Sequence, residues 1–142
     1  MRIRKEALLS ALGAAFVVAA GIYLTPLKNL NVTAPRIKDV APTTFYEEYK
    51  QNPDRFVFVD VRPPDVYNRE HAVGSINIPL HQLYTERNYL PKRGKTIVLI
   101  CSGGSASGVA YGYLEHYGFL NLRRIEGGIE AWEAAGLPTA SR

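Results

Sequence analysis

An apolar run that leads into a cysteine and a string of small residues constrains this chain more than any other feature. Thr96–Ile100 has the sequence TIVLI, Cys101 follows it, and the next seven residues are SGGSASG. A continuous β-rich run of this length is typical of a strand buried on both faces, and the amphipathic run Val109–Tyr117 predicts a helix after the loop. The pattern therefore predicts a strand, a tight loop and a helix, with the chain's single cysteine at the turn.

Signals for strands and helices alternate along the rest of the chain. Phe56–Val61 (FVFVDV) is a second candidate for a buried strand, and Thr44 with Glu47 resembles a capping box that starts a helix through Tyr49. The expected strands are 37–40, 56–61, 75–78, 96–100 and 122–125, and the expected helices are 44–49, 64–69, 81–84, the one that ends near 117, and 129–135. This alternation predicts an α/β fold with a central parallel sheet and helices on both faces.

The N-terminus differs from the rest of the chain. Three basic residues among the first five precede the uncharged stretch Ala7–Leu24, which is close to the roughly 20 apolar residues that span a bilayer. We expect a hydrophobic helix at 1–24 that acts as a transmembrane anchor or signal peptide, a linker at 25–35 and one domain at 36–142. Because the apolar run continues past the small pair Ala19-Ala20, an uncleaved anchor is favoured over cleavage there.

The distribution of charge predicts where the domain lies. Basic residues cluster before the apolar stretch, so the positive-inside rule places the N-terminus in the cytoplasm and the domain outside it, in the periplasm if the host is bacterial. Cleavage would instead give an exported soluble protein. From Pro35 onward, 13 Lys and Arg face 12 Asp and Glu. A domain this close to neutral offers no basic face for nucleic acid, so we expect no nucleic-acid partner.

The loop after Cys101 has the composition of an anion-binding turn. Its residues Ser102, Gly103, Gly104, Ser105, Ala106 and Ser107 are all small. Backbone N–H groups can therefore turn inward without obstruction, and together with the positive end of the next helix they favour a thiolate and can hold a bound oxyanion. A Gly-rich turn without activity fits the same local pattern. A single cysteine also excludes an internal disulfide and a Cys-cluster metal site.

Four segments together resemble the rhodanese-like family. They are Asp60-Val61-Arg62, then His71 with Gly74 and Asn77-Ile78-Pro79, then the Cys101 loop, and finally GGIEAWEAAGLP from Gly127 to Pro138. The resemblance runs from about Pro35 to the C-terminus in the family's order and spacing. It implies a three-layer α/β domain in which Cys101 accepts a sulfane sulfur from a donor such as thiosulfate or polysulfide, forms a persulfide, and passes the sulfur to a thiol or cyanide acceptor.

The chain departs from the family's pattern within the loop. Active members commonly carry Arg just before the final Ser or Thr, whereas Ala106 occupies that position here, and no Lys or Arg occurs from Thr96 to Asn121. Loss of a charge-assisted contact of about 1.5–3 kcal/mol is expected to weaken thiosulfate binding. It also disfavours phosphatase or arsenate reductase chemistry, which needs an Arg clamp. The alternative function is a catalytically weak module that holds a redox or sulfur-carrier protein at the membrane.

Other polar residues are expected to support the site. Asp60 and Arg62 follow a buried strand, and the resemblance implies that they pair and brace the neighbouring loops. His71 is expected to make a local hydrogen bond and Trp132 to anchor the core. His81 and His116 are expected to be solvated. The histidines lack partners at ligand spacing, so we expect no metal site, and the family implies no cofactor.

Overall fold

The computed structural model describes residues 37–142, which belong to one compact unit. The expected N-terminal helix at 1–24 and the linker at 25–35 lie outside the described residues. Within residues 37–142, none of the helices has the length and hydropathy that crossing a bilayer requires.

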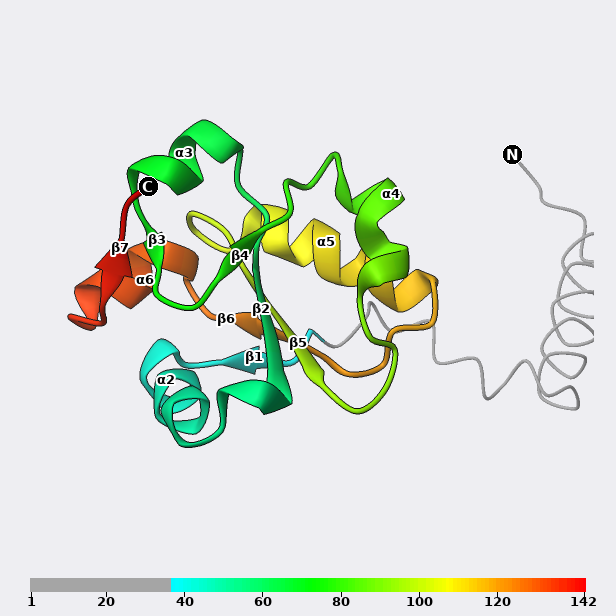
Figure 1. Cartoon of the computed structure of the whole chain (residues 1–142), viewed down its shortest axis with the longest axis horizontal. Helices are drawn as coiled ribbons and strands as arrows, with labels where there is room; N and C mark the ends of the chain where they lie inside the picture. The colour runs from blue at the N-terminus through cyan, green and yellow to red at the C-terminus, as the bar shows by residue number, and fades with distance from the viewer. Residues whose placement is uncertain (1–36) are drawn as a thin grey trace, which may run out of the picture. The chain divides into compact units, whose positions relative to one another are not determined.

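A five-stranded parallel sheet forms the centre of the domain (Figure 1). Its spatial order is β1 (Asp39–Val40), β6 (Leu122–Ile125), β5 (Thr96–Ile100), β2 (Phe56–Asp60) and β4 (Ile76–Asn77). The two longest strands, β2 and β5, pair along their whole length, from Phe56 opposite Thr96 to Asp60 opposite Ile100. Because all five strands run in one direction, their carboxyl ends meet at one edge of the sheet, where α/β proteins bind ligands.

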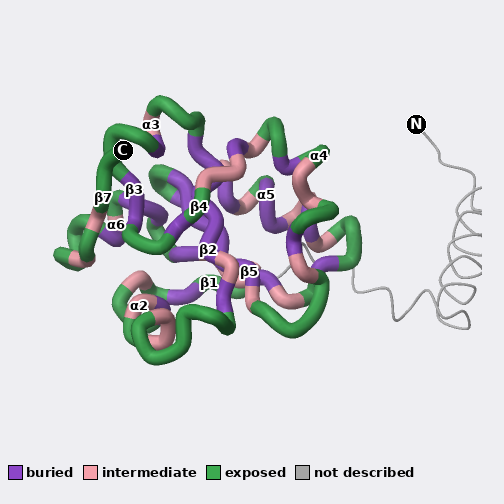
Figure 2. Tube along the Cα trace, in the orientation of Figure 1, coloured by how far each residue is buried: buried purple, intermediate pink, exposed green. Residues whose placement is uncertain are grey.

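Helices cover both faces of this sheet, as the sequence predicts. Along β5, Ile97 and Leu99 belong to one apolar cluster, and Val98 and Ile100 belong to the other. The first cluster packs under α4 (Leu83–Glu86) and α5 (Ser105–His116), and the second under α2 (Pro42–Gln51) and α6 (Gly128–Ala134). Figure 2 shows the central strands as the most deeply buried part of the trace. Burial on both faces explains why β2 and β5 are almost entirely apolar.

Several elements have the expected bounds, and others differ. The strands at 96–100 and 122–125 and the helix α3 (Pro64–Arg69) agree with the sequence prediction. The capping box was wrong: α2 begins at Pro42, after an extended Ala41, so Thr44 lies inside the first turn. A proline with its φ already set for a helix, and with no N–H to satisfy, favours this earlier start.

A second, two-stranded sheet was not predicted. β3 (His71–Ala72) pairs antiparallel with β7 (Thr139–Ala140), which fastens the C-terminal segment to the domain. The remaining elements are the 3-10 turns η2 (Pro53–Arg55) and η3 (Arg87–Tyr89). Neither β3 nor β7 contains an alternation of apolar and polar side chains long enough to indicate a strand from the sequence.

Candidate active site

Cys101 follows the last residue of β5, at the carboxyl edge of the sheet, and is 1% exposed. The loop 101–104 connects it to α5, whose first residue is Ser105. The predicted strand, loop and helix are therefore present, with the thiol at the strand-to-helix turn.

The sulfur has two polar neighbours from its own loop. The Gly104 N–H donates to Cys101 Sγ at 3.1 Å, and the S–H donates to Ser107 Oγ at 3.3 Å. The Ser107 hydroxyl in turn donates to the Gly104 carbonyl at 3.0 Å. Gly104 has φ +102°, a conformation that side-chain-bearing residues rarely adopt, so glycine is needed for this amide to face the sulfur. An N–H donor at the sulfur stabilises negative charge there.

Helix α6 holds the strand end that carries the thiol. The N–H groups of Ile129 and Glu130 donate to the carbonyls of Cys101 and Ser102 at 2.8 and 3.2 Å. This close approach depends on Gly128, because a Cβ there would lie 2.2 Å from the Ser102 carbonyl oxygen. The predicted core residue Trp132 is fully buried in the same helix, and its Nε1–H donates to the Pro138 carbonyl at 3.0 Å.

A pocket of about 310 Å³ opens over the sulfur. Of the six loop residues expected to contact substrate, four line this pocket and two, Gly104 and Ser107, are buried and contact the sulfur instead. The remaining wall comes from the segments after β2 and β4. The full lining is Val61, Arg62, Pro63, Pro79, Leu80, His81, Cys101, Ser102, Gly103, Ser105 and Ala106. His81, expected only to be solvated, is exposed and also faces this space.

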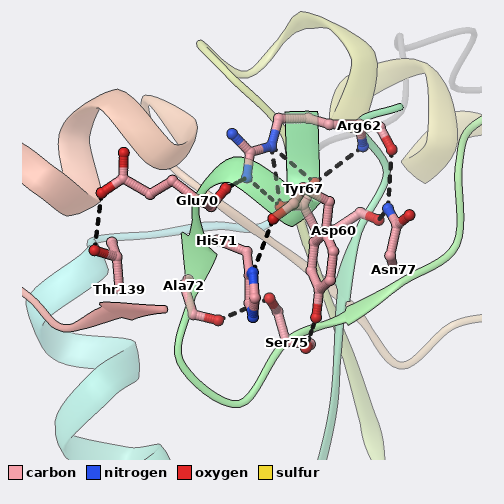
Figure 3. A network of polar contacts seen from close by, with 9 residues as sticks. All are labelled: Asp60, Arg62, Tyr67, Glu70, His71, Ala72, Ser75, Asn77 and Thr139. Carbon is pink, nitrogen blue, oxygen red and sulfur yellow. Dashed lines mark hydrogen bonds and ion pairs between the residues drawn. The ribbon is translucent and has the colours of Figure 1, made fainter. Parts of the chain in front are cut away.

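Asp60 and Arg62 form a buried ion pair next to the pocket (Figure 3). Arg62 Nε and Nη2 both donate to the Asp60 carboxylate, at distances of 2.7–3.0 Å. Nη2 also donates to the Glu70 carbonyl at 2.7 Å, which ties the strand end to the segment after α3. Asn77 Nδ2 donates to the backbone carbonyls of both residues of the pair. The pair satisfies its own buried charges, as the sequence argument required.

His71 belongs to the same network and does not line the pocket. Its ring stacks on Tyr67 with centroids 3.9 Å apart, and its Nδ1 lies 2.8 Å from the Tyr67 carbonyl. The Tyr67 hydroxyl donates to the Ser75 carbonyl at 2.5 Å. Figure 3 shows these contacts bracing the turn that leads to β4.

Arg124 is a residue of the site that sequence reasoning missed. It lies on β6 opposite Leu99 of β5, and its Nη1 donates to the Gly104 carbonyl at 3.0 Å. Its Nε and Nη2 donate to the Asp39 carboxylate at 2.7 and 2.8 Å. The hydrogen bond to Asp39 raises the pKa of Arg124. A guanidinium therefore supports the loop from behind, although the loop itself contains no cation.

The Glu130 carboxylate lies on another side of the loop, and it too was not anticipated. A Cβ on Gly103 would lie 3.5 Å from Glu130 Oε2, so this carboxylate borders the loop. Partial loss of hydration and the neighbouring Glu70 raise the pKa of Glu133, while Arg62 lowers it. Across residues 37–142, no group of three His, Cys, Asp or Glu side chains is arranged to hold a metal ion.

Comparison with known proteins identifies the fold. A family model described as the Rhodanese-like domain matches residues 42–135. The Synechocystis protein slr1261 is 38% identical over 101 residues, which are 70% of this chain and 54% of that protein. The thiosulfate sulfurtransferase PspE of Escherichia coli (strain K12) is 35% identical over 72 residues, 49% of this chain and 68% of the relative.

A solved structure agrees with these sequence matches. The crystal structure of a rhodanese-related protein from Thermoplasma volcanium has a TM-score of 0.66 to this chain at 30% identity, and the match covers 74% of this chain and 99% of the other. This chain spans about half the length of slr1261. With two thirds of its sequence under the family model and the same fold, the chain belongs to the rhodanese-like domain family.

Proposed function

We propose that this chain is a sulfurtransferase that carries a sulfane sulfur as a persulfide on Cys101. The observation that supports this most directly is the placement of Cys101 in the wall of the pocket, with the Gly104 N–H donating to its Sγ at 3.1 Å. A sulfur at an open pocket with a fixed amide donor suits a nucleophile that must hold negative charge before and after it reacts.

The proposed reaction has two steps that regenerate the enzyme. The Cys101 thiolate attacks the outer sulfur of a donor, a new S–S bond forms, the donor's own bond to that sulfur breaks, and its electron pair leaves with a group such as sulfite. A thiol or cyanide acceptor then attacks the outer sulfur of the persulfide, and the Cys101 thiolate leaves. Charge is conserved in both steps. The Gly104 N–H can stabilise the inner sulfur throughout, and the Ser107 hydroxyl can turn to donate to it.

Intact-mass measurement tests the proposal directly. Incubation of the chain with polysulfide or thiosulfate, followed by removal of excess donor, is expected to add the mass of one sulfur atom. Because Cys101 is the only cysteine, Cys101→Ser is the matched control and should gain none. Subsequent addition of cyanide or a thiol should return the original mass. Sulfur retained by Cys101→Ser, or none on the native chain with either donor, would overturn the proposal.

The alternative is a binding module for a redox or sulfur-carrier protein, and Ala106 in the pocket wall favours it. A module of that kind would hold its partner without turnover. Partner capture that is unchanged in Cys101→Ser, together with no turnover on any donor, would favour the module. Turnover that disappears in Cys101→Ser favours the enzyme.

We further propose that the segment 7–24 anchors the domain outside the cytoplasm, on the basis of its uncharged sequence and the basic residues before it. A C-terminal fusion to a reporter that is active only outside the cytoplasm tests this orientation. Reporter activity supports it, whereas activity only of a cytoplasmic reporter would show the reverse orientation.

A further inference from the structure

The pocket over Cys101 has largely apolar walls. Val61, Pro63, Pro79, Leu80 and Ala106 contribute side chains to it. Leu80 also packs against the apolar cluster beneath α4 and α5, which fixes this part of the wall. Its volume of about 310 Å³ is ample for an aromatic ring, since an apolar cavity of roughly 150 Å³ can hold benzene.

Positive charge in this pocket is already neutralised. Among the lining residues, which all belong to the described part of the chain, Arg62 is the one Lys or Arg. Its guanidinium is 7% exposed and forms a double hydrogen bond to Asp60. Arg124 contacts the back of the loop, is paired with Asp39, and is not part of the lining. Neither guanidinium is therefore a free cation for a bound dianion.

Negative charge borders the same site. A Cβ on Gly103, which lines the pocket, would lie 3.5 Å from Glu130 Oε2, so the Glu130 carboxylate borders the pocket wall. A ligand with two negative charges is repelled by this arrangement more strongly than one with a single charge. An apolar substituent on the ligand, in contrast, can bury its surface against the apolar pocket wall, which favours binding.

Resting on the proposed sulfur transfer, we infer that this site selects sulfane donors that carry one negative charge or none and an apolar organic group, in preference to the inorganic dianion thiosulfate. An organic thiosulfonate, R–SO₂–S⁻, represents this class. The Cys101 thiolate attacks its outer sulfur, the S–S bond to the sulfonyl group breaks, and the sulfinate R–SO₂⁻ leaves with the bonding pair. One thiolate and one thiosulfonate give one persulfide anion and one sulfinate, so atoms and charge balance.

Three donors that react through the same kind of bond test the inference: thiosulfate, methanethiosulfonate and benzenethiosulfonate. The full chain is assayed with each donor at pH 8. Each kcat/KM is divided by the rate constant of the same donor with a free small thiol, which removes intrinsic reactivity. We expect the normalised value for benzenethiosulfonate to exceed that for thiosulfate by at least about tenfold, with methanethiosulfonate between them.

Substitutions of Ala106 separate charge from size. Ala106→Arg places a cation in the pocket wall and should raise the normalised kcat/KM for thiosulfate about 10- to 100-fold relative to benzenethiosulfonate. Ala106→Met adds similar length without charge and should not favour thiosulfate. Leu80→Ala removes part of the apolar wall and should lower the normalised kcat/KM for benzenethiosulfonate several-fold relative to that for thiosulfate.

The outcomes distinguish this inference from the proposed function. If no donor adds sulfur to Cys101, the sulfurtransferase proposal fails. If thiosulfate loads Cys101 as well as benzenethiosulfonate does after normalisation, the sulfurtransferase proposal stands and the inferred selectivity is wrong. Equal effects of Ala106→Arg and Ala106→Met on the donor ratio would likewise refute the charge argument.

Discussion

Alanine at Gly128 is expected to destabilise the domain far more than alanine at Gly136, although both glycines have similar positive φ angles. Their φ angles are +63° and +67°, and they lie at the two ends of α6. A Cβ on Gly128 would meet the carbonyl oxygens of Ser102 and Cys101 at 2.2 and 2.3 Å, whereas one on Gly136 would have no neighbour within 4 Å. The pair therefore separates backbone strain from close packing against the active-site loop.

The expected magnitudes follow from these contacts. Both substitutions carry a left-handed strain of about 1–2 kcal/mol, partly offset by about 0.4–1 kcal/mol because alanine restricts the unfolded chain, so Gly136→Ala should cost about 1 kcal/mol. At Gly128 the helix must also move away from the strand end. The two hydrogen bonds to the Cys101 and Ser102 carbonyls, at 2.8 and 3.2 Å, are then lost at about 1 kcal/mol each, and the buried Cys101 carbonyl becomes unpaired. The total is about 3–5 kcal/mol.

Urea denaturation followed by circular dichroism measures the difference. With a slope of about 2 kcal/mol per molar urea, Gly136→Ala should lower the midpoint by about 0.5 M and Gly128→Ala by about 2 M. If Gly136→Ala folds and Gly128→Ala does not fold at all, the result agrees with the same reasoning. Midpoints that fall equally in the two variants would show that contact between α6 and the Cys101 strand end contributes nothing beyond backbone strain.

Three further predictions concern charged residues around the site. Arg124→Gln removes the charged hydrogen bond to the Gly104 carbonyl and should slow both persulfide formation and iodoacetamide alkylation of Cys101 at pH 7 about tenfold. Asp39→Asn leaves that hydrogen bond in place and should change either rate less than threefold. Asp60→Asn leaves Arg62 buried without a counter-charge and should lower the free energy of unfolding by about 3–5 kcal/mol in urea titrations; a loss below 1 kcal/mol would contradict the buried pair. Because the pKa of Glu133 is raised above 4.5, the folded state binds the Glu133 proton more tightly than the unfolded state does, so native stability should fall as the pH rises from 4.5 through the raised pKa. Glu133→Gln should lack this pH-dependent loss of stability. A difference between native and variant urea midpoints that is the same at pH 4 and pH 7 would refute this prediction.

Strands with a long apolar run and helices that begin at a proline could be predicted from the sequence because these signals are local. β5 is a five-residue run of β-branched and aliphatic residues buried on both faces, and α3 begins at a proline. The start of α2 was misplaced because two local signals competed: Thr44 with Glu47 matches a capping box, but Pro42 already fixes the first turn. The pairing of β3 with β7 depends on contacts across almost the whole domain, so no local pattern indicates it.

The thiol and its loop could be predicted for the same reason, since Cys101 and the residues to Ser107 are contiguous. The pocket wall opposite the loop could not be predicted from the sequence. Pro79 and Leu80 reach it only because β4 pairs with β2, which brings the segment after β4 beside the end of β5. The alternation of strands and helices predicts a parallel sheet but not its strand order, and the order decides which distant segments border the site.

Arg124 shows how the order of the strands in the sheet places a charged side chain at the Cys101 loop. The family's pattern has an arginine at the loop position that Ala106 occupies here. Here the cation comes from the neighbouring strand and reaches the loop from behind, at the Gly104 carbonyl, while Ala106 faces the pocket. A positive charge from β6 thus contacts the loop, while the pocket wall at Ala106 is apolar. In the proposed reaction, Arg124 would therefore support the nucleophile and Ala106 would influence the choice of donor. Substitution of Arg124 should then affect all donors alike, and substitution of Ala106 should change their ratio.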